Sequence, residues 1–271
     1  SPSKGVLWGW EVPAYVWTKA IATGTFLMMA VWHFFNGGLE SSSEMAGLMT
    51  TLVFMGFTGA LLVKDIDRPD RFLYVLLRPQ WKSWLVRGAY IITVFGGLVS
   101  LKLLDNYYQL GHDWLWIPGT LFAGLGAVYT AFLFNQARAR DLWQTPIQSA
   151  IHMLVHAIMA GSVVLMIIAP ESIEWMANIL LWGIGANIVI MAKEILMPHD
   201  TPDTKKAIHL MTKGYYSKYF WFGATYGNLG SAVILVTLSG SWALFAGVMA
   251  LIGIYLTEFV RIRVPQMIPL S

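Results

Sequence analysis

The feature that most constrains this chain is a series of eight apolar stretches, each close to twenty residues long. A helix needs about 20 such residues to cross the roughly 30 Å hydrocarbon core of a bilayer. The stretches cover residues 12–35, 47–63, 84–104, 116–136, 147–169, 174–197, 219–238 and 242–259. We therefore predict eight transmembrane helices.

Backbone chemistry and composition both favour an all-α integral membrane protein. Inside lipid only helices and closed barrels satisfy every backbone polar group, and these runs are too continuous for the alternating strands of a barrel. Hydrophobic residues make up 56% of the chain and charged residues 12%, against about 25% charged in an ordinary soluble domain. The polar segments are short, so we expect one membrane domain over residues 1–271.

The charges are distributed unevenly. Sixteen of the 18 Lys and Arg residues fall on the side that holds both chain ends and the segments near 64–83, 137–146 and 198–218. Lys19 lies within the first stretch, nearer that side, and Lys102 lies opposite. Short loops rich in cations stay in the cytoplasm. We therefore expect both termini to be cytoplasmic.

One face of the first predicted helix carries three groups that can bind or exchange protons. Glu11, Tyr15 and Lys19 recur every four residues, so they share one helix face. Ionisable residues at membrane depth are candidates for function by default. The alternative is that Lys19 extends to the interface and Glu11 only pairs with it.

The segment after the second stretch interleaves acids with arginines. It contains Asp65, Asp67, Arg68 and Arg71 around a proline. On residue chemistry alone, a solvated and self-paired interfacial loop is the simpler interpretation.

This segment resembles a motif of the polysulfide reductase membrane-subunit family, the NrfD/PsrC-like proteins. That family has Asp-Leu-Gly-Arg-Pro-x-Arg-Phe at the end of its second span, followed by a Pro and a Ser-Trp pair. The chain has Asp65-Ile-Asp-Arg-Pro-Asp-Arg-Phe72, then Pro79 and Ser83-Trp84. It departs from the pattern at Asp67, where the family usually has Gly, which adds a carboxylate to the turn.

The resemblance implies an eight-helix membrane anchor, built as two four-helix bundles, in the cytoplasmic (inner) membrane of a prokaryote. Such an anchor exchanges electrons between membrane quinone, menaquinone or ubiquinone, and a ferredoxin-like iron–sulfur subunit on the cytoplasmic face. Through that partner it serves a molybdopterin-type catalytic subunit of a respiratory oxidoreductase. It is not catalytic alone.

The resemblance also assigns candidate site residues. The quinone site would lie in the first bundle, with Tyr15 and Tyr129 as matching positions. A Tyr hydroxyl is a weak acid, so a nearby proton source is needed, and Glu11, Lys19, Asp65 and Asp67 are the candidates. Arg68 would orient the loop and dock the partner, whose contacting surface should be acidic.

Histidines and missing cysteines bear on other cofactors. The chain has no Cys, so it cannot ligate an iron–sulfur cluster through thiolates. His152 and His156 lie one turn apart on the fifth stretch, so they cannot both ligate one haem without a partner helix. A haem-bearing cytochrome b anchor is therefore disfavoured, and we expect no metal site. His152 remains a candidate for polar packing or a proton route.

A different class of function remains open. A small-solute or ion transporter could use Lys19, Lys193 and Glu194 as an intramembrane site, although no repeat or broken midplane helix is evident. The half of the chain opposite the basic side offers Lys102 and Asp105, which we expect near the surface.

Overall fold

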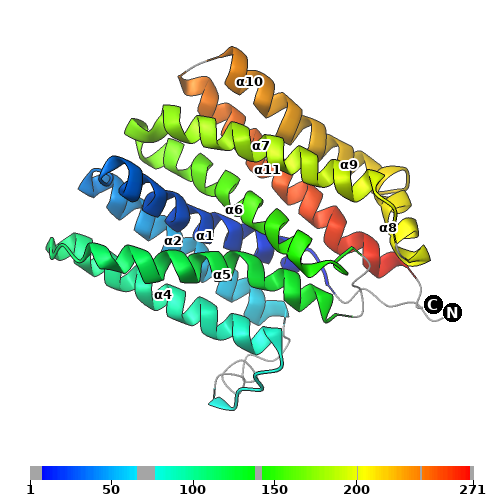
Figure 1. Cartoon of the computed structure of the whole chain (residues 1–271), viewed down its shortest axis with the longest axis horizontal. Helices are drawn as coiled ribbons and strands as arrows, with labels where there is room; N and C mark the ends of the chain where they lie inside the picture. Colours follow the sequence, from blue (N-terminus) through cyan, green and yellow to red (C-terminus); the bar gives the residue numbers. More distant parts are fainter. Residues whose placement is uncertain (1–7, 66–76, 138–141, 200, 239, 269–271) are drawn as a thin grey trace.

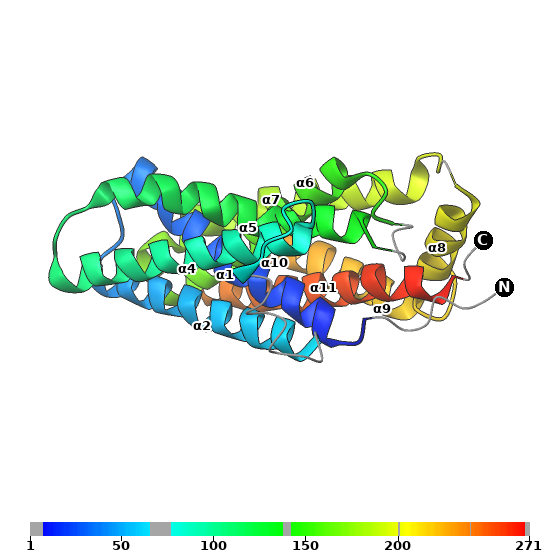
Figure 2. The ribbon, with the colours of Figure 1, turned by 90° about the horizontal axis from the view of Figure 1, so that it is seen from below.

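The computed structural model describes residues 8–65, 77–137, 142–199, 201–238 and 240–268, and the regular secondary structure within them is entirely helical. The long helices run back and forth along one direction (Figures 1 and 2). They are α1 (Glu11–Asn36), α2 (Ser41–Asp65), α4 (Trp84–Tyr108), α5 (Trp116–Asn135), α6 (Pro146–Ile168), α7 (Ile173–Leu196) and α11 (Ser241–Arg263). All seven, within the described residues, are long and apolar enough to cross a membrane, which marks an integral membrane protein.

The eighth predicted span, residues 219–238, is helical but interrupted. It consists of α9 (Ser217–Ala224), a π-helical turn (Thr225–Gly230) and α10 (Ser231–Thr237). None of these three pieces alone is long enough to span a bilayer. The number of eight separate transmembrane helices is therefore not confirmed, since seven uninterrupted ones are found in the described chain.

Helix α1 lies at the centre of the assembly. It packs against α2, α5, α6 and α11. Its most apolar window is 89% buried inside the protein, whereas the corresponding windows of α2, α4 and α7 are 28% buried. Polar residues of α1 are therefore shielded from lipid by other helices.

Two glycines let α1 and α6 cross in backbone contact. A Cβ atom at Gly24 would collide with the carbonyl oxygen of Ala157, and one at Gly161 would collide with that of Gly24. Small residues at such crossings allow helix backbones to approach closely in lipid. This contact fixes α6, which carries both buried histidines, against the central helix.

The two ends of the described chain meet at one end of the bundle. The backbone N–H of Trp8 donates to Gln266 Oε1 at 2.8 Å, and Gln266 Nε2 donates back to the Trp8 carbonyl at 3.1 Å. The short helix α8 (Pro202–Thr212) crosses the same end (Figures 1 and 2). The sequence predicts a loop near residues 198–218, and the structure has this helix there instead. We call this end of the molecule the basic end, because the predicted cation-rich segments belong to it.

Lys102 and Asp105, at the opposite end, are buried rather than near the surface. Lys102 is 3% exposed, and its Nζ donates to Asp105 Oδ2 at 2.7 Å. Asn106 Nδ2 donates to Glu44 Oε1 at 3.1 Å, which joins α4 to the first turn of α2. These contacts explain why α2 begins at Ser41, six residues before the predicted apolar stretch.

Candidate functional site

A cavity of about 270 Å³ opens at the basic end between α1, α2, α4 and α5. The described residues that line it include Trp8, Glu11, Tyr15, Leu62, Leu133 and Gln136. The lining is thus apolar with a few polar groups, which is the usual make-up of a small-molecule site. Tyr15 is a buried residue at 5% exposure, so the cavity reaches past the surface to this side chain.

Glu11 stands at the mouth of this cavity and pairs with α2. Its Oε1 lies 3.3 Å from Lys64 Nζ, and Lys64 also lies over the Trp10 ring at 4.4 Å. The alternative that Glu11 pairs with Lys19 is therefore wrong. The pairing joins the first turn of α1 to the last turn of α2.

Lys19 lies one turn deeper than Tyr15 and is 1% exposed. Its Nζ donates to the carbonyl of Gly126 at 2.8 Å, to that of Ala127 at 3.3 Å and to Thr130 Oγ1 at 2.7 Å. The ammonium group therefore makes three hydrogen bonds to α5 and does not extend to the interface.

Tyr129 lies beside this lysine. Lys19 Nζ is 4.5 Å from the centre of the Tyr129 ring and 5.9 Å from that of Tyr15. Tyr129 fits against α4 because Gly88 has no side chain, and a Cβ there would overlap the ring. The structure thus brings Tyr15, Lys19 and Tyr129 together, with Tyr15 at the cavity.

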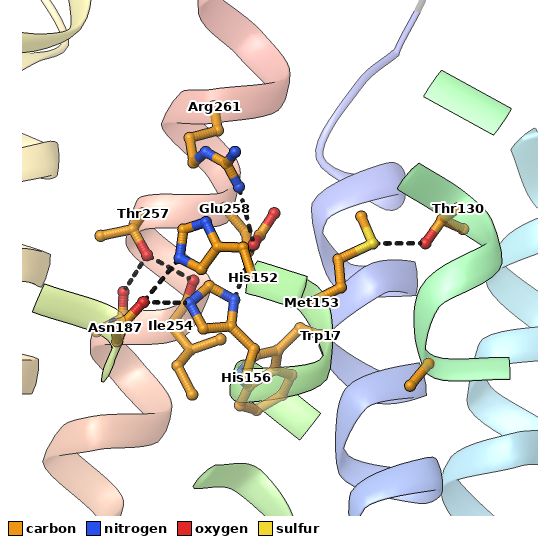
Figure 3. A network of polar contacts seen from close by, with 12 residues as sticks. Trp17, Thr130, His152, Met153, His156, Asn187, Ile254, Thr257, Glu258 and Arg261 are labelled. Carbon is orange, nitrogen blue, oxygen red and sulfur yellow. Dashed lines mark hydrogen bonds and ion pairs between the residues drawn. The ribbon is translucent and has the colours of Figure 1, made fainter. Parts of the chain in front are cut away.

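A second polar cluster occupies the space between α6, α7 and α11 (Figure 3). His152 Nε2 is 2.7 Å and His156 Nε2 is 3.0 Å from the same atom, Asn187 Oδ1. Asn187 Nδ2 donates to Asn228 Oδ1 at 2.8 Å. Asn228 belongs to the π-helical turn, a feature that is frequent at functional sites.

Glu258 and Arg261 of α11 complete this cluster. His156 Nδ1 and Arg261 Nη1 lie 2.8 Å and 3.6 Å from Glu258 Oε1 (Figure 3). Arg261 Nε also donates to Glu194 Oε1 at 3.2 Å. The contact between His156 and Glu258 could not be found from the sequence, because the two residues lie on separate helices and the sequence does not show how each helix is rotated about its axis.

A cavity of about 390 Å³ leads from the basic end to this cluster. His152, Lys193, Glu194, His199 and Arg261 contribute to its lining. His152 therefore belongs to this second cavity and not to the cavity at Tyr15. Lys193 and Glu194 line this second cavity, whereas Lys19 is hydrogen-bonded to α5. The three residues of the transporter alternative therefore do not form one site.

Two of the predicted residues, Asp67 and Arg68, lie outside the described part of the chain. Asp65 is the last residue of α2, and its side chain is also outside the description. Among the described residues, no group of three or more His, Asp or Glu side chains could hold a metal ion.

The fold and the two buried polar regions define a class: an integral membrane protein with a cavity at one end and ionisable groups enclosed between its helices. A family model described as polysulphide reductase, NrfD, matches residues 2–269, which is nearly the whole chain. The protein belongs to the NrfD family, whose members are quinone-interacting membrane subunits of respiratory oxidoreductases. No curated protein matches the chain.

Proposed function

We propose that this protein binds membrane quinone in the cavity at Tyr15 and exchanges electrons between it and an iron–sulfur subunit docked on the basic end. The observation that carries the proposal is the cavity itself, which combines apolar walls from Leu62 and Leu133 with a buried Tyr hydroxyl. A quinone head group is a flat apolar ring with two carbonyl acceptors. Such a ring suits these walls, and the Tyr15 hydroxyl can donate to a carbonyl.

The position of the cavity supports direct electron exchange. The chain has no cysteine, so electrons must come from, or go to, a cluster held by another subunit. A cavity at the end of the bundle keeps the distance to such a partner short. The partner, in turn, would connect to a molybdopterin-type catalytic subunit, and its contacting surface should be acidic to match the cations of this end.

The proposed arrangement in the membrane follows from the same elements. The interrupted run α9, π-helical turn and α10 totals 21 residues from Ser217 to Thr237, enough for an eighth crossing. Helices α1, α2, α4 and α5 would then form one four-helix bundle around the quinone cavity. Helices α6, α7, α9–α10 and α11 would form the other, with the basic end facing the cytoplasm.

Tyr15→Phe, alone and with Glu11→Gln, tests the quinone site in the assembled complex. Losing one hydrogen bond worth about 1–1.5 kcal/mol should weaken quinone binding by about tenfold. Quinone-coupled turnover should fall as well. Tyr107→Phe, a matched change at an exposed tyrosine of the opposite end, should leave both unchanged. Unchanged turnover in the double variant, with the complex intact, would contradict the proposal.

A further inference from the structure

The hydrogen bonds around Asn187 determine where protons lie in the α6–α7–α11 cluster. Asn187 Nδ2 donates to Asn228 Oδ1, so its oxygen faces the two histidines. An amide oxygen only accepts hydrogen bonds. Both His152 Nε2 and His156 Nε2, at 2.7 Å and 3.0 Å from that oxygen, must therefore carry protons.

With the proton on Nε2, the other ring nitrogen of His156, Nδ1, faces a second hydrogen-bond acceptor, the carboxylate of Glu258. A neutral imidazole has one N–H, so a proton on Nε2 leaves Nδ1 with a lone pair. His156 Nδ1 lies 2.8 Å from Glu258 Oε1, and an ionised carboxylate also only accepts. The contact does not have hydrogen-bond geometry, so both atoms are buried without a hydrogen-bond partner among the described residues, and two lone pairs this close repel each other unless a proton lies on one of the atoms. Either His156 is an imidazolium or Glu258 is a carboxylic acid.

We propose that Glu258 and His156 together hold one proton and exchange it for the quinone chemistry at Tyr15. Both side chains are nearly fully buried, at 1% and 2% exposure, so the proton is held away from bulk water. The use of this proton in quinone chemistry rests on the proposed function. The presence of the proton between the two side chains does not. Converting a quinone to its quinol takes two electrons, exchanged with the iron–sulfur partner, and two protons, which the pair would pass one at a time.

The pair has a route to the basic end. His152 and Arg261 line the 390 Å³ cavity and both contact the pair. The His152 ring centre is 4.4 Å from that of His156, and Arg261 Nη1 is 3.6 Å from Glu258 Oε1. His152 Nδ1 is buried without a hydrogen-bond partner among the described residues. Water in this cavity would thus be one side chain away from the stored proton.

On its other side, the pair faces the central helix. Val16, Ala127, His156 and Glu258 line a cavity of about 10 Å³, close to the space that one water occupies. Glu258 Oε2 has no hydrogen-bond partner in the described chain and can accept from such a water. Ala127 also accepts from Lys19, the neighbour of Tyr129, so the small cavity lies between the proton pair and the tyrosine side.

Infrared and nitrogen NMR spectroscopy of the full chain in lipid test the stored proton without any quinone. We expect either a carboxylic acid C=O band that Glu258→Gln removes, or an imidazolium signal that His156→Gln removes. An ionised Glu258 facing a neutral His156 protonated on Nδ1 would overturn the proposal. That result would mean that the Asn187 and Asn228 amides are both turned around.

Turnover of the assembled complex in membrane vesicles tests the use of the proton. Glu258→Gln should slow quinone-coupled turnover and proton uptake or release by at least about tenfold, with quinone affinity unchanged. Glu258→Asp keeps a carboxylic acid at this position, so its turnover should fall less than that of Glu258→Gln. It also replaces the Gln variant in the test if that variant does not assemble into the complex. Glu40→Gln, at an exposed acid of the opposite end, is the matched control. Unchanged turnover in Glu258→Gln overturns the relay, whereas unchanged turnover in Tyr15→Phe counts against the quinone site instead.

Discussion

Gly24 in α1 and Gly161 in α6 contact each other backbone to backbone, and neither position has room for a Cβ atom. The contact places the histidine-bearing helix against the helix that carries Tyr15 and Lys19. Distances between the two polar regions therefore depend on this crossing.

Gly161→Ala should separate the two helices and lower the stability of the protein. Overpacking a tight contact costs about 1–3 kcal/mol, and here the obstacle is backbone rather than a flexible side chain. Gly97→Ala is the matched control, because nothing lies within 4 Å of a Cβ at that position. Unfolding in mild detergent, monitored by circular dichroism, measures both. Equal stabilities for the two variants would argue against a tight crossing.

Lys102→Met should destabilise the end of the bundle opposite the cavity at Tyr15. Lys102 Nζ lies 2.7 Å from Asp105 Oδ2 and 3.8 Å from Glu44 Oε1, so the substitution removes the lysine charge from two buried carboxylates, which keep their contacts with His112 and Asn106. Removing one partner of a buried pair costs about 3–5 kcal/mol.

The matched control for this change is Lys206→Met. Lys206 is 62% exposed and pairs with Asp203 at 3.1 Å, and such surface pairs contribute less than about 1 kcal/mol. Denaturant unfolding compares the two variants. A similar small loss in both would show that the Lys102 cluster contributes little to stability.

The positions of the helices could be predicted because lipid permits few alternatives. Helix α4 begins at Trp84, which is also the first residue of the predicted apolar run 84–104. Helix α6 begins at Pro146, one residue before the first residue of the predicted run 147–169. The polar first turn of α2 was missed because hydropathy cannot show that Asn106 and Lys102 will cover Glu44.

Side-chain pairing between distant helices could not be predicted in the same way. The repeat of Glu11, Tyr15 and Lys19 correctly placed Lys19 near Tyr15, since the contact depends on one helix alone. The contact between His156 and Glu258 depends on how α6 and α11 rotate about their axes, which tertiary packing decides. The helical interruption at residues 225–230 likewise had no signal in the apolar pattern.

Lys19→Met should preserve the fold and reduce quinone-coupled turnover. Methionine keeps an unbranched apolar side chain, and burying a charge is itself costly, so we expect little loss of stability. The loss of a charge-assisted donor beside Tyr15 and Tyr129 should lower turnover by about tenfold.

Lys218→Met provides the control for Lys19→Met. Lys218 Nζ also lies over tyrosine rings, at 5.0 Å from Tyr219 and 5.4 Å from Tyr215, but away from the cavity at Tyr15. Its replacement should leave turnover unchanged in membrane vesicles that contain the complex. A full loss of folding in Lys19→Met, with no soluble complex recovered, would instead assign this lysine a structural role.

The absence of cysteine allows a direct test of orientation, because every thiol introduced will be the only one in the chain. Lys206→Cys places a thiol at an exposed position of α8 at the basic end, and Tyr108→Cys places one at the exposed end of α4 on the opposite side. A maleimide that cannot cross membranes should label Tyr108→Cys in intact cells and Lys206→Cys in inverted vesicles. The positive-inside rule predicts this result, since nearly all the cations belong to the end that carries α8. The reverse labelling pattern would place the cavity at Tyr15 and the proposed iron–sulfur docking surface on the outer face of the membrane.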